Sequence, residues 1–286
     1  MCGNVARRHF IEVTVTEVKH AVLSLPPLEV LMERLAATAS ESQAVRLCVE
    51  AARTQVFHHP DGRTDSLGSV FLFEPQLAAL NYLCGDLPAG ASVDIGFGMG
   101  SSACIILGAR SLQAGNFRHI AIDPYGLPDS RGLVVQSYLL ETFGEAFVRV
   151  KERSETALGG LIKTQGPGSA ALLFIDGGHA FETVVVDFVL SDVLCKVGGY
   201  IIFDDADYPA IETALNYIEV NRPNYAFSRG VIKNTAILKK IADYHMPWDA
   251  FTPFQVAQRT GWTPVSCVAG YVASDAEFAR QDGIEA

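Results

Sequence analysis

The chain has 286 residues, of which 49% are hydrophobic and 19% charged, so it can bury a substantial core and is not an intrinsically disordered protein. Its net charge of -10 at pH 7 opposes binding to nucleic acid, which requires clustered Lys and Arg. No apolar run reaches the roughly 18 residues of a membrane-spanning helix. The six cysteines show neither a CxxC pair nor zinc-ligand spacing. These features predict a cytoplasmic protein with reduced thiols that binds neither nucleic acid nor membrane.

Residues 1–70 are predicted to form an α-rich N-terminal addition that begins with a strand. Residues 10–18 alternate apolar and polar side chains, as a half-buried strand does. Residues 28–38 follow as a helix, and Ser40 with Gln43 matches a capping box that opens a second helix, ending near Val56. The segment 57–63 is rich in helix and strand breakers and is predicted to be a loop.

Residues 71–240 alternate apolar strands with helical stretches, a pattern typical of a parallel sheet covered by helices on both faces. A helix from Pro75 to about Leu83 leads into this region. The predicted strands are 92–95, 119–122, 147–150, 171–175, 200–203, 225–228 and 235–238. The last two are separated by too little chain for a helical crossover, so they should form an antiparallel hairpin. The prediction is an α/β domain of seven strands, followed by a C-terminal extension over 241–286.

The first strand of this domain runs into a glycine-rich loop with the sequence VDIGFGMG at 93–100. Glycines allow a sharp turn from strand to helix in which the backbone passes close to a ligand. Asp123 closes the second strand, where a carboxylate can accept hydrogen bonds from both hydroxyls of a ribose. Together the loop and the acid predict a nucleotide-type cofactor. The loop alone would also fit an ordinary tight turn.

A second set of polar residues follows the fourth and fifth strands, with Asp176 and His179 after one and Asp204 and Asp205 after the other. Three converging carboxylates repel one another unless a cation neutralises them, and oxygen ligands suit Mg²⁺. A neutral imidazole at His179 is suited to take a proton from a hydroxyl bound nearby. The alternative is structural: acids that cap the next helix or lie in a solvated turn, and a histidine that packs at the start of the helix from Phe181.

VDIGFGMG at 93–100 and AIDPYG at 121–126 resemble the motifs of class I S-adenosylmethionine-dependent methyltransferases over about residues 70–240. The resemblance implies a Rossmann-like seven-stranded methyltransferase sheet, mostly parallel with its last strand antiparallel, and S-adenosylmethionine as cofactor. The loop backbone would face the methionine part of the cofactor and Asp123 the ribose. The implied cofactor-binding residues are Asp94, Gly96, Phe97, Gly98, Gly100, Ser101, Ser102, Asp123 and Ser154, with Ser101 and Ser102 also expected to cap the following helix.

The pair FIDGGHAF and FDD resembles the metal-dependent O-methyltransferases, including the macrocin and mycinamicin sugar enzymes and, more distantly, the catechol type. This resemblance implies that Asp176, Asp204 and Asp205 are ligands of Mg²⁺ or another divalent cation. It implies that His179 is the general base, so His179 and Asp176 are the predicted catalytic residues.

The implied activity is methylation of a hydroxyl on a small molecule, a sugar or a phenol, in secondary metabolism such as antibiotic biosynthesis. Three alternatives stay open: a metal-independent methyltransferase with another small-molecule acceptor, a nicotinamide-dependent oxidoreductase, and a non-catalytic subunit that binds S-adenosylmethionine. The GxGxG spacing opposes the oxidoreductase, whose loop is usually GxGxxG. The amphipathic N-terminal helices and the aromatic tail also raise the expectation of a homodimer.

Overall fold

A computed structural model describes residues 21–67, 71–113, 115–124 and 132–257. The strand predicted at 10–18 and the part of the C-terminal extension after residue 257 lie outside these ranges. Among the helices that are described, none is both long enough and apolar enough to cross a membrane.

The described residues form one eight-stranded sheet, with the spatial order β1-β9-β10-β8-β7-β4-β5-β6. Strand β10 runs antiparallel to both neighbours, and the other pairs are parallel. The predicted Rossmann-like α/β sheet is therefore confirmed. The predicted number of strands, seven, is one short, because the two-residue strand β1 also pairs with β9 at the edge of the sheet. A strand of two residues shows no detectable alternation. The bounds are β1 Ala21–Val22, β4 Ala91–Ile95, β5 His119–Ile122, β6 Phe147–Val150, β7 Ala170–Ile175, β8 Cys195–Phe203, β9 Tyr225–Arg229 and β10 Ala236–Lys240.

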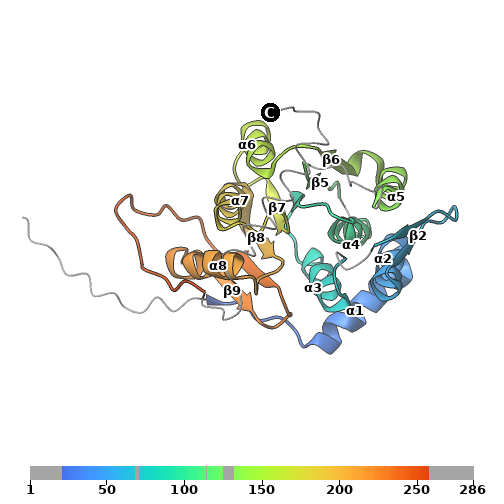
Figure 1. Cartoon of the computed structure of the whole chain (residues 1–286), viewed down its shortest axis with the longest axis horizontal. Coiled ribbons are helices and arrows are strands. Elements are labelled where there is room, and N and C mark those ends of the chain that lie inside the picture. Colours follow the sequence, from blue (N-terminus) through green and yellow to red (C-terminus); the bar gives the residue numbers. More distant parts are fainter. Residues whose placement is uncertain (1–20, 68–70, 114, 125–131, 258–286) are drawn as a thin grey trace, which may run out of the picture.

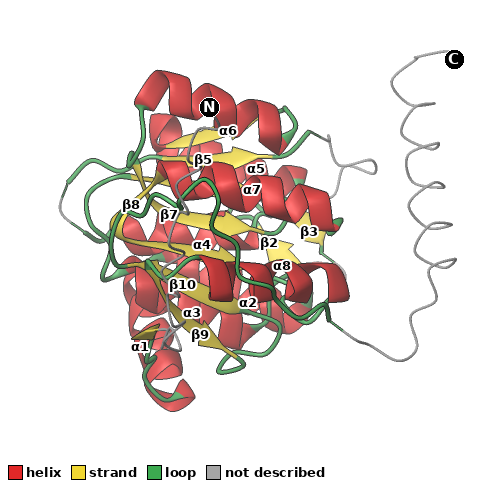
Figure 2. Cartoon of the chain, turned by 90° about the vertical axis from the view of Figure 1, so that its left-hand side faces the viewer, coloured by secondary structure: helices red, strands yellow, loops and turns green. Residues whose placement is uncertain are grey.

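Helices cover both faces of the sheet and enclose two apolar cores (Figures 1 and 2). Alternation along β7 fills both cores at once, since Leu172 and Phe174 face one core while Leu173 and Ile175 face the other. Helices α1 to α5 contribute to the first core, and α6, α7 and α8 contribute to the second. The helices are α1 Leu28–Glu41, α2 Gln43–Thr54, α3 Glu74–Cys84, α4 Ser101–Arg110, α5 Leu133–Phe143, α6 Ser154–Gln165, α7 Phe181–Leu194 and α8 Pro209–Asn221.

The N-terminal addition differs from its prediction at two points. The cap of α2 is Ser42, whose hydroxyl accepts from the Val45 N–H at 3.4 Å, and not Ser40, because α1 continues to Glu41. The segment predicted as a loop contains a two-stranded hairpin, β2 Val56–His58 with β3 Thr64–Ser66.

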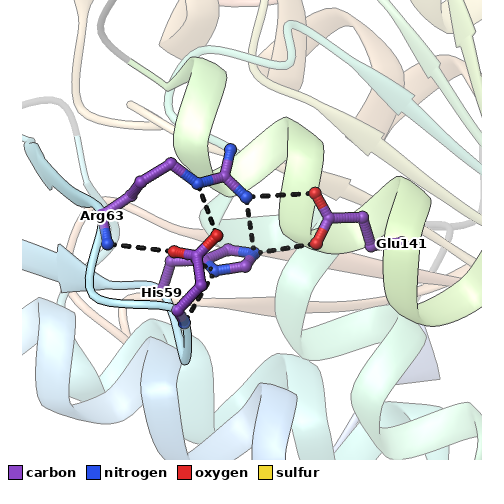
Figure 3. A network of polar contacts seen from close by, with 4 residues as sticks. His59, Arg63 and Glu141 are labelled. Carbon is purple, nitrogen blue, oxygen red and sulfur yellow. Dashed lines mark hydrogen bonds and ion pairs between the residues drawn. The ribbon is translucent and has the colours of Figure 1, made fainter.

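A polar network fastens this hairpin to α5 (Figure 3). The buried His59 lies with its Nε2 atom 3.2 Å from Glu141, and Arg63 donates a hydrogen bond to Glu141 at 3.1 Å. Arg63 also pairs with Asp61 within the turn at 2.7 Å. Because α5 packs beside the glycine loop through Val135, the hairpin supports the site from outside the sheet.

The C-terminal extension runs back along α8. Asn221 exchanges hydrogen bonds with the backbone of Thr252 at 2.9 and 2.8 Å, and the Phe254 ring packs on Tyr217 with centroids 5.5 Å apart. Trp248 and Phe251 in the same segment are exposed.

Candidate active site

Strand register brings the predicted site residues together at one edge of the sheet. Ile95 pairs with Ile122 on one side and with Ile175 on the other, and Ile175 pairs with Phe203. The residues that follow these four strand ends are Gly96, Asp123, Asp176 and Asp204. They therefore form a row along the carboxyl edge, which is the edge at which open α/β sheets bind ligands.

The three glycines of the loop all have positive φ, at +94° for Gly96, +48° for Gly98 and +75° for Gly100. The sequence suggested that Gly96 allows close approach of a ligand. In the structure a Cβ atom at Gly96 would collide with the backbone carbonyl of Asp176, so the neighbouring strand end already requires this glycine. At Gly98 no atom of the described residues lies within 4 Å of a Cβ position. The loop surface is therefore open to a bound molecule at Gly98.

Asp123 is fixed against the glycine loop. Its Oδ2 atom accepts hydrogen bonds from the N–H groups of Phe97 at 3.1 Å and Gly98 at 3.2 Å. Arg149 of β6 lies beneath this contact, with Nη2 3.6 Å from Asp123 Oδ2 and its guanidinium 4.7 Å from the centre of the Phe97 ring. Sequence reasoning missed Arg149, whose signal is a single basic residue inside the strand FVRV. The loop, the acid and Arg149 thus form one rigid unit.

Other predicted cofactor residues support the loop from inside the protein. The fully buried carboxylate of Asp94 accepts a hydrogen bond from the Ser102 hydroxyl at 2.5 Å, and burial raises the pKa of Asp94 to about 7. The Ser101 hydroxyl accepts from the Leu72 N–H at 3.4 Å. Neither serine caps α4, because both lie inside the helix and its N-cap is Gly100, which corrects the expectation.

The structure also places two further predicted residues. The buried Phe97 ring packs on Phe147 with centroids 6.0 Å apart. Ser154 is the first residue of α6, so it lies at the start of the helix that follows β6.

The carboxylate cluster forms where β7 and β8 end. One ligand atom from each of Asp176, His179 and Asp205 lies within 4.8 Å of the others. Asp205 adopts a left-handed conformation, with φ of +49°, which Asp tolerates better than most residues and which is common at functional turns. Asp204, the third predicted ligand, accepts a hydrogen bond from Gln76 Nε2 at 2.5 Å. The structure thus places His179 within the group of possible ligands and turns one oxygen of Asp204 toward α3.

The acids of the cluster share an unfavourable electrostatic environment. Burial and the neighbouring charge of Asp204 raise the pKa of Asp176 well above its usual value. Burial also raises the pKa of Asp204 to about 6 and raises that of Asp205. His179 is more accessible, with 41% of its side chain exposed, and its ring contacts Tyr208 edge to face at 5.1 Å. A cation bound between these groups would relieve the repulsion.

Comparison with known protein families identifies the central part of the chain. Residues 93–206 match a family described as a methyltransferase domain. The matched residues contain the glycine loop, Asp123 and the whole carboxylate cluster.

The curated relative and the solved structures differ in what they cover. A segment of 56 residues, 18% of the chain, is 43% identical to the uncharacterized protein R132 of Acanthamoeba polyphaga mimivirus, and this segment covers 25% of that protein. The Podospora anserina methyltransferase PaMTH1, solved with SAH, superposes with a TM-score of 0.52 at 14% identity, over 77% of this chain and 99% of that one. Cofactor-bound Rv0187 from MTB superposes with a TM-score of 0.52 at 18% identity, over 77% of this chain and 100% of that one. A protein from Corynebacterium glutamicum superposes with a TM-score of 0.50 at 17% identity, over 73% of this chain and 92% of that one. These structures share the fold.

Proposed function

We propose that the chain is an S-adenosylmethionine-dependent O-methyltransferase that requires a divalent cation, Mg²⁺, and methylates a hydroxyl of a small molecule, in keeping with the match of residues 93–206 to a methyltransferase domain. The observation that carries the proposal is the convergence of Asp176, His179 and Asp205 within 4.8 Å beside the glycine loop.

The residues of the cluster fit a divalent cation. Two carboxylates and one imidazole each bring one candidate ligand atom within 4.8 Å of the other two, and Asp204 precedes Asp205 at the end of β8. Their raised pKa values show that ionised carboxylates are unfavourable there without a compensating positive charge. Carboxylate oxygens are the ligands that Mg²⁺ and Mn²⁺ prefer.

The loop and Asp123 fit S-adenosylmethionine. The open surface at Gly98 leaves space against the backbone, and Asp123 is held next to it by the N–H groups of the loop. In this arrangement the backbone of 96–100 would hold the methionine part, and Asp123 the ribose.

The chain's own contribution to the reaction is to orient two substrates and to move a proton. A bound cation would hold the acceptor hydroxyl and lower its pKa, and S-adenosylmethionine would supply the methyl group. The edge contact of Tyr208 and the 3.2 Å contact with Asp205 fix the imidazole of His179. His179 can then take the hydroxyl proton, and the loop would hold the methyl donor in attack geometry.

A sugar or phenol acceptor agrees with the aromatic side chains around the cluster. Tyr208 contacts His179 directly. Phe73, with 64% of its surface exposed, lies at the N-terminus of α3, and its N–H donates to the same Gln76 that holds Asp204. Aromatic rings of this kind pack on the apolar face of a sugar or on a phenol ring. The acceptor is thus proposed to be a secondary metabolite of one of these two classes.

Calorimetry and a methyl-transfer assay test the proposal together. We expect one S-adenosylhomocysteine site per chain and no comparable binding of NAD. With radiolabelled S-adenosylmethionine and a panel of sugar and phenol acceptors, transfer should stop in EDTA and return with excess Mg²⁺. Full transfer in EDTA would replace the proposal with a metal-independent methyltransferase, and selective NAD binding would replace it with an oxidoreductase.

A further inference from the structure

Gln76 connects three parts of the protein through its side-chain amide. Its Nε2 atom donates to Asp204 Oδ1 at 2.5 Å and to Thr235 Oγ1 at 3.2 Å, while its Oε1 atom accepts from the Phe73 N–H at 3.0 Å. Only 8% of the residue is exposed. The side chain therefore joins the start of α3, the end of β8 and the residue before β10, with both amide protons in use.

Two neighbours act on Asp204 in opposite ways. Gln76 Nε2 donates a hydrogen bond to its carboxylate at 2.5 Å. Asp176 carries a negative charge that repels the same carboxylate. Without the amide, repulsion would favour rotation of Asp204 away from the cluster. The 2.5 Å hydrogen bond opposes that rotation.

Gln76 is an uncharged hydrogen-bond donor to Asp204, which suits a cation site. A Lys or Arg at the same place would also hold Asp204, but its positive charge would compensate the carboxylates and compete with a bound cation. An amide donor fixes the carboxylate and leaves the net negative charge of the cluster unchanged. Groups that orient ligating carboxylates in this way typically contribute about 10- to 100-fold to metal affinity.

We infer that Gln76 is a positioning residue for the cation site: it holds one oxygen of Asp204 and so fixes this carboxylate next to Asp176 and Asp205, the acids that would bind the divalent ion. This inference rests on the proposed function. Gln76 lies outside the matched residues 93–206, so the site depends on a residue of the preceding helix.

A purely structural alternative exists, because Gln76 also caps the N-terminus of α3 by accepting the Phe73 N–H through its Oε1 atom. The cap uses the carbonyl end of the amide, whereas the positioning contact uses the nitrogen end. Loss of the cap should lower the melting temperature without a specific effect on metal binding.

Binding of Mn²⁺ to the S-adenosylhomocysteine complex, followed by the EPR signal of free Mn²⁺, separates the two. Gln76→Met keeps the length and approximate volume of the side chain but removes every hydrogen bond. We expect Mn²⁺ affinity to fall by about 10-fold or more, with S-adenosylhomocysteine affinity within about twofold of wild type. In the transfer assay, turnover should fall at low Mg²⁺ and recover at high Mg²⁺.

Thr235→Val is the matched control, since it removes the other partner of the same nitrogen and leaves Asp204 bound to Gln76. It should keep wild-type Mn²⁺ affinity. If Gln76→Met does not fold, Gln76→Asn, which retains an amide but is one methylene too short to reach Asp204, takes its place with the same expected loss.

The outcomes distinguish the inference from the proposal on which it rests. Equal Mn²⁺ affinity in wild type and the Gln76 variants would overturn the positioning inference and leave the metal site in place. The absence of Mn²⁺ binding to wild type would overturn the metal-dependent function and the inference with it.

Discussion

The Nε2 atom of His179 lies 3.2 Å from Oδ2 of Asp205, although the two residues follow different strands, β7 and β8. The parallel pairing of Ile175 with Phe203 sets these strand ends side by side. The contact places the imidazole where it can either accept a proton from an acceptor hydroxyl or serve as a ligand itself. Variants can distinguish these two possibilities.

Replacing His179 by Ala should reduce turnover by about 10²-fold or more, the usual contribution of a general base. If His179 is the base, Mn²⁺ and S-adenosylhomocysteine affinity should stay at the wild-type level, because Asp176 and Asp205 remain. His179→Lys should retain part of the activity, since an amine can also accept a proton. Near wild-type turnover of His179→Ala would make the residue structural, and a parallel loss of Mn²⁺ affinity would make it a ligand.

Asp123 can be tested with two variants of different hydrogen-bonding capacity. Asp123→Ala removes the acceptor for the N–H groups of Phe97 and Gly98 and the proposed ribose contacts. Hydrogen bonds to a charged group contribute about 1.5 to 3 kcal/mol, so calorimetry should show at least a tenfold loss of S-adenosylhomocysteine affinity. Asp123→Asn keeps an acceptor and should lose less. Unchanged affinity in both variants would remove Asp123 from the cofactor site.

Asp94 gives a prediction on pH and stability. Burial raises its pKa from 3.8 to about 7, so between these values the folded protein binds more protons at this site than the unfolded chain does. The contribution of Asp94 to the free energy of unfolding therefore falls as pH rises from about 4 to about 7. Asp94→Asn keeps an oxygen acceptor for Ser102 and cannot ionise. In urea unfolding, the free energy of unfolding of Asp94→Asn should rise relative to that of the wild type as the pH increases from 5 to 8. A difference independent of pH would contradict this.

The exposed ring of Phe73 is proposed to contact the acceptor. Phe73→Ala should raise KM for an active acceptor from the panel by about tenfold, in line with the roughly 1.5 kcal/mol or more gained by burying an aromatic ring. The affinity for S-adenosylhomocysteine should not change. Phe251→Ala is the control, because this ring is also 64% exposed but lies in the C-terminal extension. Equal effects of the two substitutions would remove Phe73 from the acceptor site.

Local sequence patterns were enough to predict seven of the eight strands in the described sheet and the antiparallel hairpin that the last two form. The strands His119–Ile122 and Phe147–Val150 have the predicted bounds, because each is a short, mostly apolar segment bounded by polar residues or turns. Strand β1 was missed because it pairs with the distant β9. The hairpin of β2 and β3 was missed because its strands are only three residues long and flank a turn rich in breakers. The cytoplasmic location and the homodimer stay predictions.

The site was predictable in so far as it follows from strand ends. Gly96, Asp123, Asp176 and Asp204 lie in one row because parallel pairing aligns the residues before them. Arg149 and Gln76 were missed because each acts on a residue far away in the sequence, and nothing in the local pattern indicates the partner. The directions of Ser101 and Ser102 were also unpredictable, because they depend on Leu72 and on Asp94.

A crystal structure with S-adenosylhomocysteine and Mn²⁺ tests the central claim most directly, through anomalous diffraction from the metal. The account predicts one anomalous peak within coordination distance of Asp176 and Asp205, next to the cofactor, with the ribose hydroxyls at Asp123. A structure with S-adenosylhomocysteine bound at saturating Mn²⁺, but with no peak between these carboxylates, would contradict the claim that the cluster binds a catalytic cation.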